Sequence, residues 1–357
     1  MNTLAKIGKL IFGTLIVAGL TVNAQTTYVW TGAQDSYWTN AANWTVGGSV
    51  ASVPPGRCYD ADGNLNDAQI LAVVQFGAIQ TENTTVDLDG FYEVTNVVVT
   101  SGAPDYTLGT SATDATQKFA LCKKGCFTVL SGASGVTIHR LWYHAAQNAR
   151  PNYRYSLSNG SDKELVVTKF GGCDGTQYGQ QNPTTFSGTG AIRLCGLDSS
   201  ATGYPLTPIL QFQKGGRLIF DGNFYGTSCS EISAAANSEN EIEITDGYKF
   251  SGASNWYGFV VPVSSKIFVS GEGSFQQYED TKSAAPTVKT PTPHAVSGIL
   301  TIGCKVVGKA FHIYSGVGTT ALTRMDNEME GLWLLSESAG ATVSVTSFGS
   351  GDGYSSL

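Results

Sequence analysis

The chain is built from short β-rich runs, each followed by a turn that contains glycine. Cys126–Leu130 precedes Ser131-Gly132, and Lys266–Val269 precedes Ser270-Gly271. Val, Ile, Thr and Phe dominate such runs, whereas Gly, Asn, Asp and Ser favour turns. The composition agrees, since 43 of the 357 residues are Gly and only 14% are charged. A coiled coil, a basic nucleic-acid-binding domain and a charge-rich disordered chain are therefore excluded.

The turns are unevenly spaced along the chain. The Ser-Gly dipeptides at Ser187, Ser251 and Ser270, for example, stand 64 and 19 residues apart. Uneven spacing argues against a propeller with equal blades and suits a parallel β-helix, in which loops of any length leave the corners of stacked coils. We predict an all-β fold, a single-stranded right-handed parallel β-helix whose apolar runs Ile209–Phe212 and Phe259–Val263 face the core. A β-sandwich is the main alternative.

Helix is expected almost nowhere, because no stretch keeps a 3.6-residue apolar period over three turns. Leu141–Arg150 is the best helical candidate, and Pro151 would end it. Ser283–His294 contains three prolines, which exclude it from a central strand and indicate a loop.

Residues 1–24 have the pattern of a secretory signal peptide that is cleaved between Ala24 and Gln25. Met1–Lys9 carries two lysines and no acid, and Leu10–Leu20 is apolar but too short to span a membrane. The expected location is therefore secreted, extracellular or on the outer cell surface, with no transmembrane segment in the mature chain. Loss of the two lysines changes the formal charge from −7 to −9. We expect so acidic a chain to avoid nucleic acid.

All seven cysteines lie beyond the signal peptide. Exported proteins meet oxidising conditions, so disulfides are expected, and an odd number leaves at least one thiol outside the internal pairs. Cys122 and Cys126 are the most local candidate pair, because the intervening Lys-Lys-Gly could form a turn that brings their Cα atoms within about 6 Å.

The strongest local motif opens the mature chain. Tyr28–Gly32 reads Tyr-Val-Trp-Thr-Gly and is followed by Trp38, by Ala42-Asn43-Trp44 and by Pro54–Gly56. Across residues 28–110 the chain resembles bacterial secreted β-helix proteins of the autotransporter-passenger, pectin-lyase-like kind. The resemblance implies that this opening caps a solenoid and that the next runs are its first coils. We therefore predict a Trp-rich cap over residues 25–67 and a β-helix over residues 68–357, which could continue beyond them.

Three clusters of side chains are candidate binding sites. The three tryptophans of the opening could stack on sugars, although covering the end of the solenoid is the simpler role for such large side chains. Better sugar candidates are two aromatic groups in loop-like contexts, where function concentrates. These candidates are Trp142, Tyr143 and His144, with Arg150 and Arg154 nearby, and Trp256 with Tyr257. The alternative for both groups is aromatic packing against a β-helix face.

One acidic loop could hold a cation. Calcium prefers six to eight oxygen ligands, and Asp and Asn alternating around a glycine can supply several of them. The residues are Asp60, Asp62, Asn64, Asn66 and Asp67. No Glu stands at the twelfth position of an EF-hand, so a solvated Asx-turn loop is the alternative. No other cofactor is expected. Glu239, Glu241 and Glu243 share one strand face, which we interpret as a solvated face.

These patterns favour a structural or adhesive β-helix, secreted or exposed on the surface, that presents loops to glycans or cell-surface proteins. A polysaccharide lyase or glycoside hydrolase is the enzymatic alternative, and a carbohydrate-binding module is the third. The basic cluster of His139, Arg140, His144, Arg150 and Arg154 is where an active site would be sought. The Asp-Asp and Gly-His-Gly motifs of pectin-hydrolysing enzymes are absent from the sequence.

Overall fold

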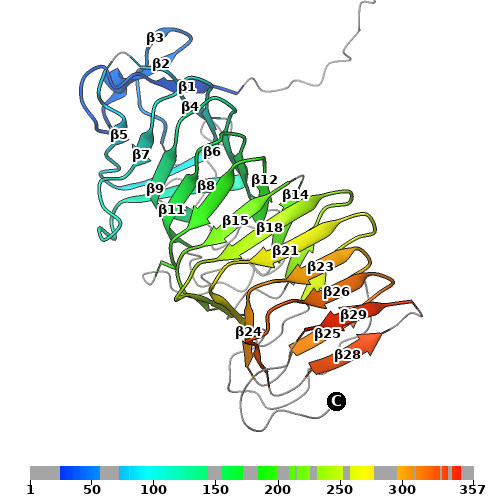
Figure 1. The fold of residues 1–357 in the computed structure, drawn as a ribbon. Helices are drawn as coiled ribbons and strands as arrows, with labels where there is room; N and C mark the ends of the chain where they lie inside the picture. The colour runs from blue at the N-terminus through cyan, green and yellow to red at the C-terminus, as the bar shows by residue number, and fades with distance from the viewer. Residues whose placement is uncertain are drawn as a thin grey trace, which may run out of the picture.

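The protein is an all-β parallel solenoid, seen in a computed structural model as strands stacked along a rod (Figure 1). The structure describes residues 25–56, 72–79, 81–143, 155–171, 184–198, 209–213, 215–225, 231–251, 258–276, 296–308, 311–329, 332–336 and 340–346. Within them the only helix is the 3-10 turn η1 (Ala41–Asn43). No helix in this part of the chain is long and apolar enough to cross a membrane.

Each coil of the solenoid crosses two long parallel faces in turn. The first face contains β4 (Val73–Phe76), the second half of β6 (Phe91–Val99) and of β8 (Lys118–Val129), β10 (Tyr155–Asn159), β12 (Thr184–Ser187), β14 (Ile209–Gln213), β17 (Glu231–Ala234) and β20 (Gly258–Val260). The second face contains β5 (Thr85–Val86), β7 (Tyr106–Leu108), β9 (Val136–Tyr143), β11 (Leu165–Phe170), β13 (Ala191–Leu194), β15 (Arg217–Phe220), β18 (Glu239–Ile244), β21 (Lys266–Ser270), β23 (Ile299–Ile302), β26 (Thr319–Leu322) and β29 (Thr342–Val345). Figure 1 shows β15 to β29 of this face descending the rod.

A shorter third face closes the coil. At the N-terminal end it is formed by the first halves of β6 and β8 with the last residues of β9. Further along it contains β16 (Phe224–Tyr225), β19 (Lys249–Ser251), β22 (Ser274–Gln276), β24 (Lys305–Gly308) and β27 (Glu328–Met329). A separate parallel pair joins β25 (Phe311–Ser315) to β28 (Leu332–Ser336).

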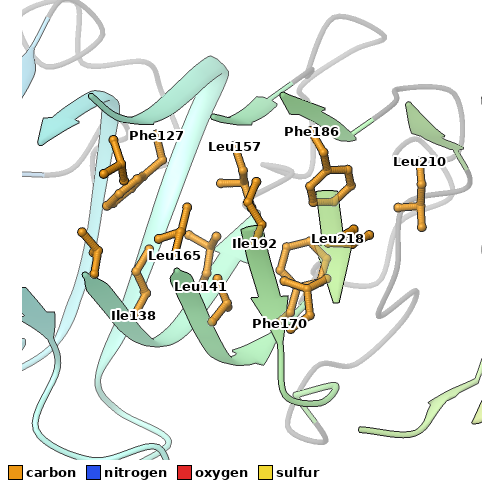
Figure 2. Close-up of a cluster of buried hydrophobic side chains, with 14 of the residues drawn as sticks. Phe127, Ile138, Leu141, Leu157, Leu165, Phe170, Phe186, Ile192, Leu210 and Leu218 are labelled. Carbon is orange, nitrogen blue, oxygen red and sulfur yellow. The ribbon is translucent and has the colours of Figure 1, made fainter. Parts of the chain in front are cut away.

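Inward side chains stack into continuous apolar columns. On the first face Phe127, Leu157 and Phe186 are register partners on successive strands, and all are fully buried. Figure 2 shows these three in one row and Ile138, Leu165, Ile192 and Leu218 in the row that faces them. The predicted core runs are confirmed at Leu210 and Phe212 and at Phe259 and Val261. Val263, predicted to face the core, is instead 63% exposed, because the chain has left β20 and entered a turn there. Parallel pairing with one shared core excludes the β-sandwich, which is antiparallel.

The N-terminal end is the one place where antiparallel pairing occurs among the described strands. β1 (Thr27–Trp30) pairs in parallel with β4, and β2 (Trp44–Val46) and β3 (Ser49–Val50) fold back antiparallel beside it. The three tryptophans of the opening motif are buried, with ring centroids 4.9 Å apart for Trp30–Trp44 and 4.7 Å for Trp38–Trp44. Each indole N–H donates to a backbone carbonyl. Buried rings cannot stack on a sugar, so packing is their role.

The helix expected over residues 141–150 does not begin where the sequence indicated. Leu141–Tyr143 is instead the end of β9, and the rest of that range lies outside the described residues. Leu141 is buried in register with Phe119 of β8 and Phe170 of β11. Stacking between coils therefore decides the conformation of this segment.

Close approach of successive coils makes some turn glycines irreplaceable. A Cβ on Gly271, where φ is +99°, would lie 2.2 Å from the backbone oxygen of Ile244 in the preceding coil. Gly247, where φ is +78°, has nothing within 4 Å of such a Cβ. We predict that Gly247→Ala lowers the free energy of unfolding by about 1–2 kcal/mol, from left-handed strain alone. Gly271→Ala should cost roughly 1–3 kcal/mol more, because the neighbouring turn must also move.

Urea denaturation of the two single variants measures this difference, and each serves as the control for the other. Equal losses would show that the coils tolerate the extra methyl group and that the close approach at Gly271 is unimportant.

Candidate functional site

A column of three cations crosses neighbouring coils where the second face meets the third. Arg140 of β9 is the register partner of Lys169 on β11. On the other side, Leu141 pairs with Phe119 of β8, which places Lys118 beside Arg140. Like charges directly opposite one another on adjacent strands are destabilising. The column therefore needs negative charge close to it.

Asp198 supplies that charge from two coils further along. Its Oδ1 accepts from Arg140 Nη2 at 2.6 Å, and the two side chains are 0% and 6% exposed. Arg140 Nη1 also donates to the backbone oxygen of Asp114 at 3.0 Å. Removing one charge from a buried ion pair of this kind strongly destabilises the folded protein, because the other charge is left buried without a partner. Asp198 thus holds Arg140 inside the corner.

The second oxygen of Asp198 fixes Trp142. Trp142 Nε1 donates to Asp198 Oδ2 at 2.6 Å. Lys118 Nζ lies 3.8 Å from the centroid of the indole ring, a cation–π contact, and Phe91 approaches edge-on with centroids 6.4 Å apart. Trp142 is nevertheless partly exposed. The ring is held by one hydrogen bond at its edge and one cation over its face.

Gly171 lies in the coil between the tryptophan and the aspartate. Its N–H donates to Leu141 O at 3.1 Å, and Asp198 N–H donates to Phe170 O at 3.0 Å, so Gly171 occupies the coil between Trp142 and Asp198. Its φ is +126°, a conformation that favours glycine. The carboxylate of Asp198 reaches the indole across the coil that contains this glycine.

The second face carries a separate set of charges that neutralise one another. Arg193 binds Glu164 at 2.7 Å and Asp221 at 3.2 Å, and this guanidinium lowers the pKa of Glu164. Arg217 lies 3.2 Å from Glu241 and 3.6 Å from Glu243.

Lys266 completes the set, 2.6 Å from Glu239. The three glutamates of β18 therefore form ion pairs with the strands on both sides. The predicted solvated face is confirmed, because the side chains of Glu239, Glu241 and Glu243 point outward and are 72%, 38% and 30% exposed. Because β18 lies inside the sheet between β15 and β21, this face also carries cations from both neighbouring strands.

His139 stands at the same corner as the cation column. Its Nδ1 lies 3.4 Å from Thr168 Oγ1 on the next coil. Burial lowers the pKa of His139, because the charged imidazolium loses hydration there.

The structure describes only part of the predicted binding groups. Trp142 has the contacts given above, whereas for Tyr143 only the backbone, at the end of β9, is described. The other predicted residues lie outside the described part of the chain: His144, Arg150, Arg154, Trp256, Tyr257, Asp60, Asp62, Asn64, Asn66 and Asp67. Among the residues that the structure describes, no group of three His, Cys, Asp or Glu side chains could hold a metal ion. The calcium loop therefore stays a prediction.

The Cys122–Cys126 disulfide is not formed, because Cys126 is a free thiol. Both positions belong to the single strand β8, and Cys126 points outward with its sulfur 3.1 Å from Thr128 Oγ1. Cys195 and Cys304 are also free. Burial raises the pKa of Cys304 to about 12 and makes that thiol unreactive in the folded state.

Sequence reasoning missed Asp198, Lys118 and Lys169 as members of the site. Asp198 is 56 residues from Trp142, and its place beside the ring depends on the register of the intervening coil. The one local indication of the site was Phe170-Gly171, because a glycine after a β-rich run predicts that a turn follows Lys169.

Comparisons of the chain with protein-family models, with curated proteins and with solved structures find no match. They give no support to membership of the autotransporter-passenger or pectin-lyase-like groups. What the structure itself establishes is the parallel β-solenoid.

Asp198→Asn tests the buried pair. Asparagine keeps an oxygen that can accept from Trp142 Nε1 but removes the charge that faces Arg140. We predict a loss of about 3–5 kcal/mol in the free energy of unfolding, measured by urea denaturation. Glu328→Gln is the control, because its pair with Lys305 at 2.7 Å is largely exposed on the glutamate side and should cost less than about 1 kcal/mol. Similar losses of unfolding free energy in the two variants would contradict the conclusion that Asp198 stabilises the fold through a buried ion pair.

His139 gives a prediction about pH. Its pKa is lower in the folded than in the unfolded chain, so the unfolded chain binds more protons as the pH falls through about 6.5. The free energy of unfolding should therefore decrease between pH 7.5 and pH 5.5, roughly the range where histidine titrates. His139→Gln should show a smaller decrease in the same denaturation series. An unchanged pH dependence would assign the effect to other groups.

Proposed function

We propose that this protein is a secreted or surface-exposed structural β-helix that contacts glycans or cell-surface proteins through Trp142 and the segments next to it. The signal-peptide pattern of residues 1–24 supports export. The Trp-rich opening, similar to that of surface-exposed β-helix proteins, supports the same location.

The observation that carries the proposal is the way in which Trp142 is held. Aromatic rings give binding sites a large rigid contact area, and an immobilised side chain loses little further entropy when a ligand binds. Trp142 is partly exposed, and Asp198, Lys118 and Phe91 fix its ring from three directions. These contacts support a ring that is oriented in advance and can meet a ligand with its exposed part.

The path of the chain supports presentation of loops near this ring. After Tyr143 and Gly171 the chain leaves the third face, and it is next described on the first face at Tyr155 and Thr184. The two described strands that precede these stretches of sequence, β9 and β11, therefore end side by side near Trp142. Loops on rigid scaffolds are common sites of recognition.

Substitution of Trp142 tests the proposal on protein collected from the culture medium, where its N-terminus should be Gln25. Trp142→Ala should reduce retention on a glycan array or on intact cells at least about tenfold, the usual scale for a tryptophan at the centre of an interface. Trp142→Phe should retain part of the binding, because a ring remains but the bond to Asp198 is lost. Trp256→Ala tests the second aromatic group in the same assay.

Tyr37→Ala is the matched control, because Tyr37 is an exposed aromatic residue in the N-terminal part of the rod. Far-ultraviolet circular dichroism checks that each variant keeps its β structure. Unchanged retention in Trp142→Ala overturns the role of this ring. Turnover of a polysaccharide that depends on His144 or Arg154 would instead support the enzymatic alternative.

A further inference from the structure

The first face carries two columns of outward, uncharged side chains, all of them able to donate or accept a hydrogen bond except Val98. From β4 to β14 the strands pair in parallel, and their outward positions are register partners from one coil to the next. One column contains Gln75, Val98, Thr128, Ser158, Ser187 and Gln213, and the other contains Asn96, Cys126, Ser156, Thr185 and Gln211. All but Thr185 are at least partly exposed.

Charge is excluded from this face over six consecutive strand segments. Among the described residues of β4, β10, β12 and β14, and of Asn96–Val99 and Cys126–Val129 in β6 and β8, there is no Asp, Glu, Lys or Arg. The second face of overlapping coils, by contrast, carries Arg193 and Arg217 with their acidic partners. Folding of the solenoid does not by itself require an uncharged surface.

Many of these polar groups are not used by the protein. Within the described residues, the hydroxyls of Ser158 and Ser187 and the amides of Gln75, Gln211 and Gln213 form no hydrogen bond with another protein group. The exceptions lie mainly in the other column, where Thr185 Oγ1 donates to Ser156 Oγ at 2.5 Å and Asn96 Oδ1 accepts from Cys126 N–H at 3.1 Å. The column from Gln75 to Gln213 therefore offers hydrogen-bond donors and acceptors to a ligand.

The strand geometry arranges these groups as a regular lattice. Neighbouring strands are about 4.8 Å apart, and alternate residues along a strand are about 6.7 Å apart. Hydroxyls and amides both donate and accept hydrogen bonds, so the lattice matches a ligand that does the same at repeated intervals. A polyanion would find no ion pair on this face, and an extended peptide pairs with a sheet edge rather than with its side chains.

We infer that the first face, from β4 to β14, is a binding surface for a neutral polysaccharide, which lies against the hydroxyl and amide columns. Individual contacts of this kind are weak, and many along one chain add up through multivalency. The surface lacks charge, so salt should affect the binding little. This surface is separate from Trp142 on the third face and goes beyond the function proposed above.

The test removes hydroxyls from one face while a matched variant removes them from another. The first variant combines Thr128→Val, Ser158→Ala and Ser187→Ala. The control combines Thr301→Val, Thr319→Val and Ser344→Ala, which are outward positions of the second face. Sedimentation with insoluble cellulose, chitin and β-1,3-glucan measures binding. The unmodified protein should sediment with at least one of them, including in about 1 M NaCl, where charges are screened within about 3 Å.

We expect the first variant to bind at least about tenfold more weakly, since three hydrogen-bonding groups are removed, and the control to bind normally. Ser158→Lys, which places a charge in the lattice, should also lose binding. Failure of the unmodified protein to sediment with any of the three polysaccharides overturns the inference, as does equal binding by both triple variants.

Trp142→Ala separates this inference from the proposed function. If Trp142→Ala loses polysaccharide binding and the first-face variant keeps it, the Trp142 site stands and the first-face site is wrong. The reverse result upholds the first face and removes the role of Trp142 in glycan binding.

Discussion

Parallel backbone pairing between coils is the interaction on which the rest of this structure depends. Each strand in the middle of a face bonds to the strand before it and to the strand after it, so the side chain at one position meets its counterpart in the next coil. A single register therefore creates the apolar columns inside and the polar or charged columns outside. The cation column at Lys118, Arg140 and Lys169 arises from the same rule.

The three faces divide the chemistry of the surface among them. The second face brings arginines and glutamates together, and their charges cancel in pairs such as Arg193–Glu164. The third face holds Trp142 beside a buried aspartate. Among the side chains that the structure describes between β4 and β14, the first face has neither a charge nor an exposed aromatic group. In a solenoid such differences can extend over several coils, because each coil adds one strand to each face, and on the first face the uncharged stretch ends where β17 begins with Glu231.

The fold could be predicted from the sequence because its determinants are local. Short β-rich runs and glycine turns repeat along the chain, and the core positions at Leu210 and Phe212 follow from the apolar run itself. The site could not be predicted, because its members meet only through the register. Lys118, Trp142 and Asp198 come from three coils, and no spacing in the sequence marks them as neighbours.

Local patterns also failed where stacking opposed them. Leu141 begins a stretch with helical character, yet it continues β9 because Phe119 and Phe170 flank it in the core. Cys126 follows a Lys-Lys-Gly sequence suited to a turn, yet it lies in β8 and points outward beside Thr128.

The hydrogen bonds of Asp198, which skip a coil, have a consequence for how the solenoid unfolds. Side-chain bonds such as Arg193–Glu164 and Thr185–Ser156 join residues 29 positions apart, which is one coil, whereas the more exposed Arg324–Glu272 bond joins residues 52 positions apart. Arg140–Asp198 and Trp142–Asp198 join residues 58 and 56 positions apart and so skip a coil. In a linear array with only nearest-neighbour coupling, an end can fray one coil at a time. A bond that spans three coils makes them a single cooperative unit, so fraying that starts at the C-terminal end should pause there.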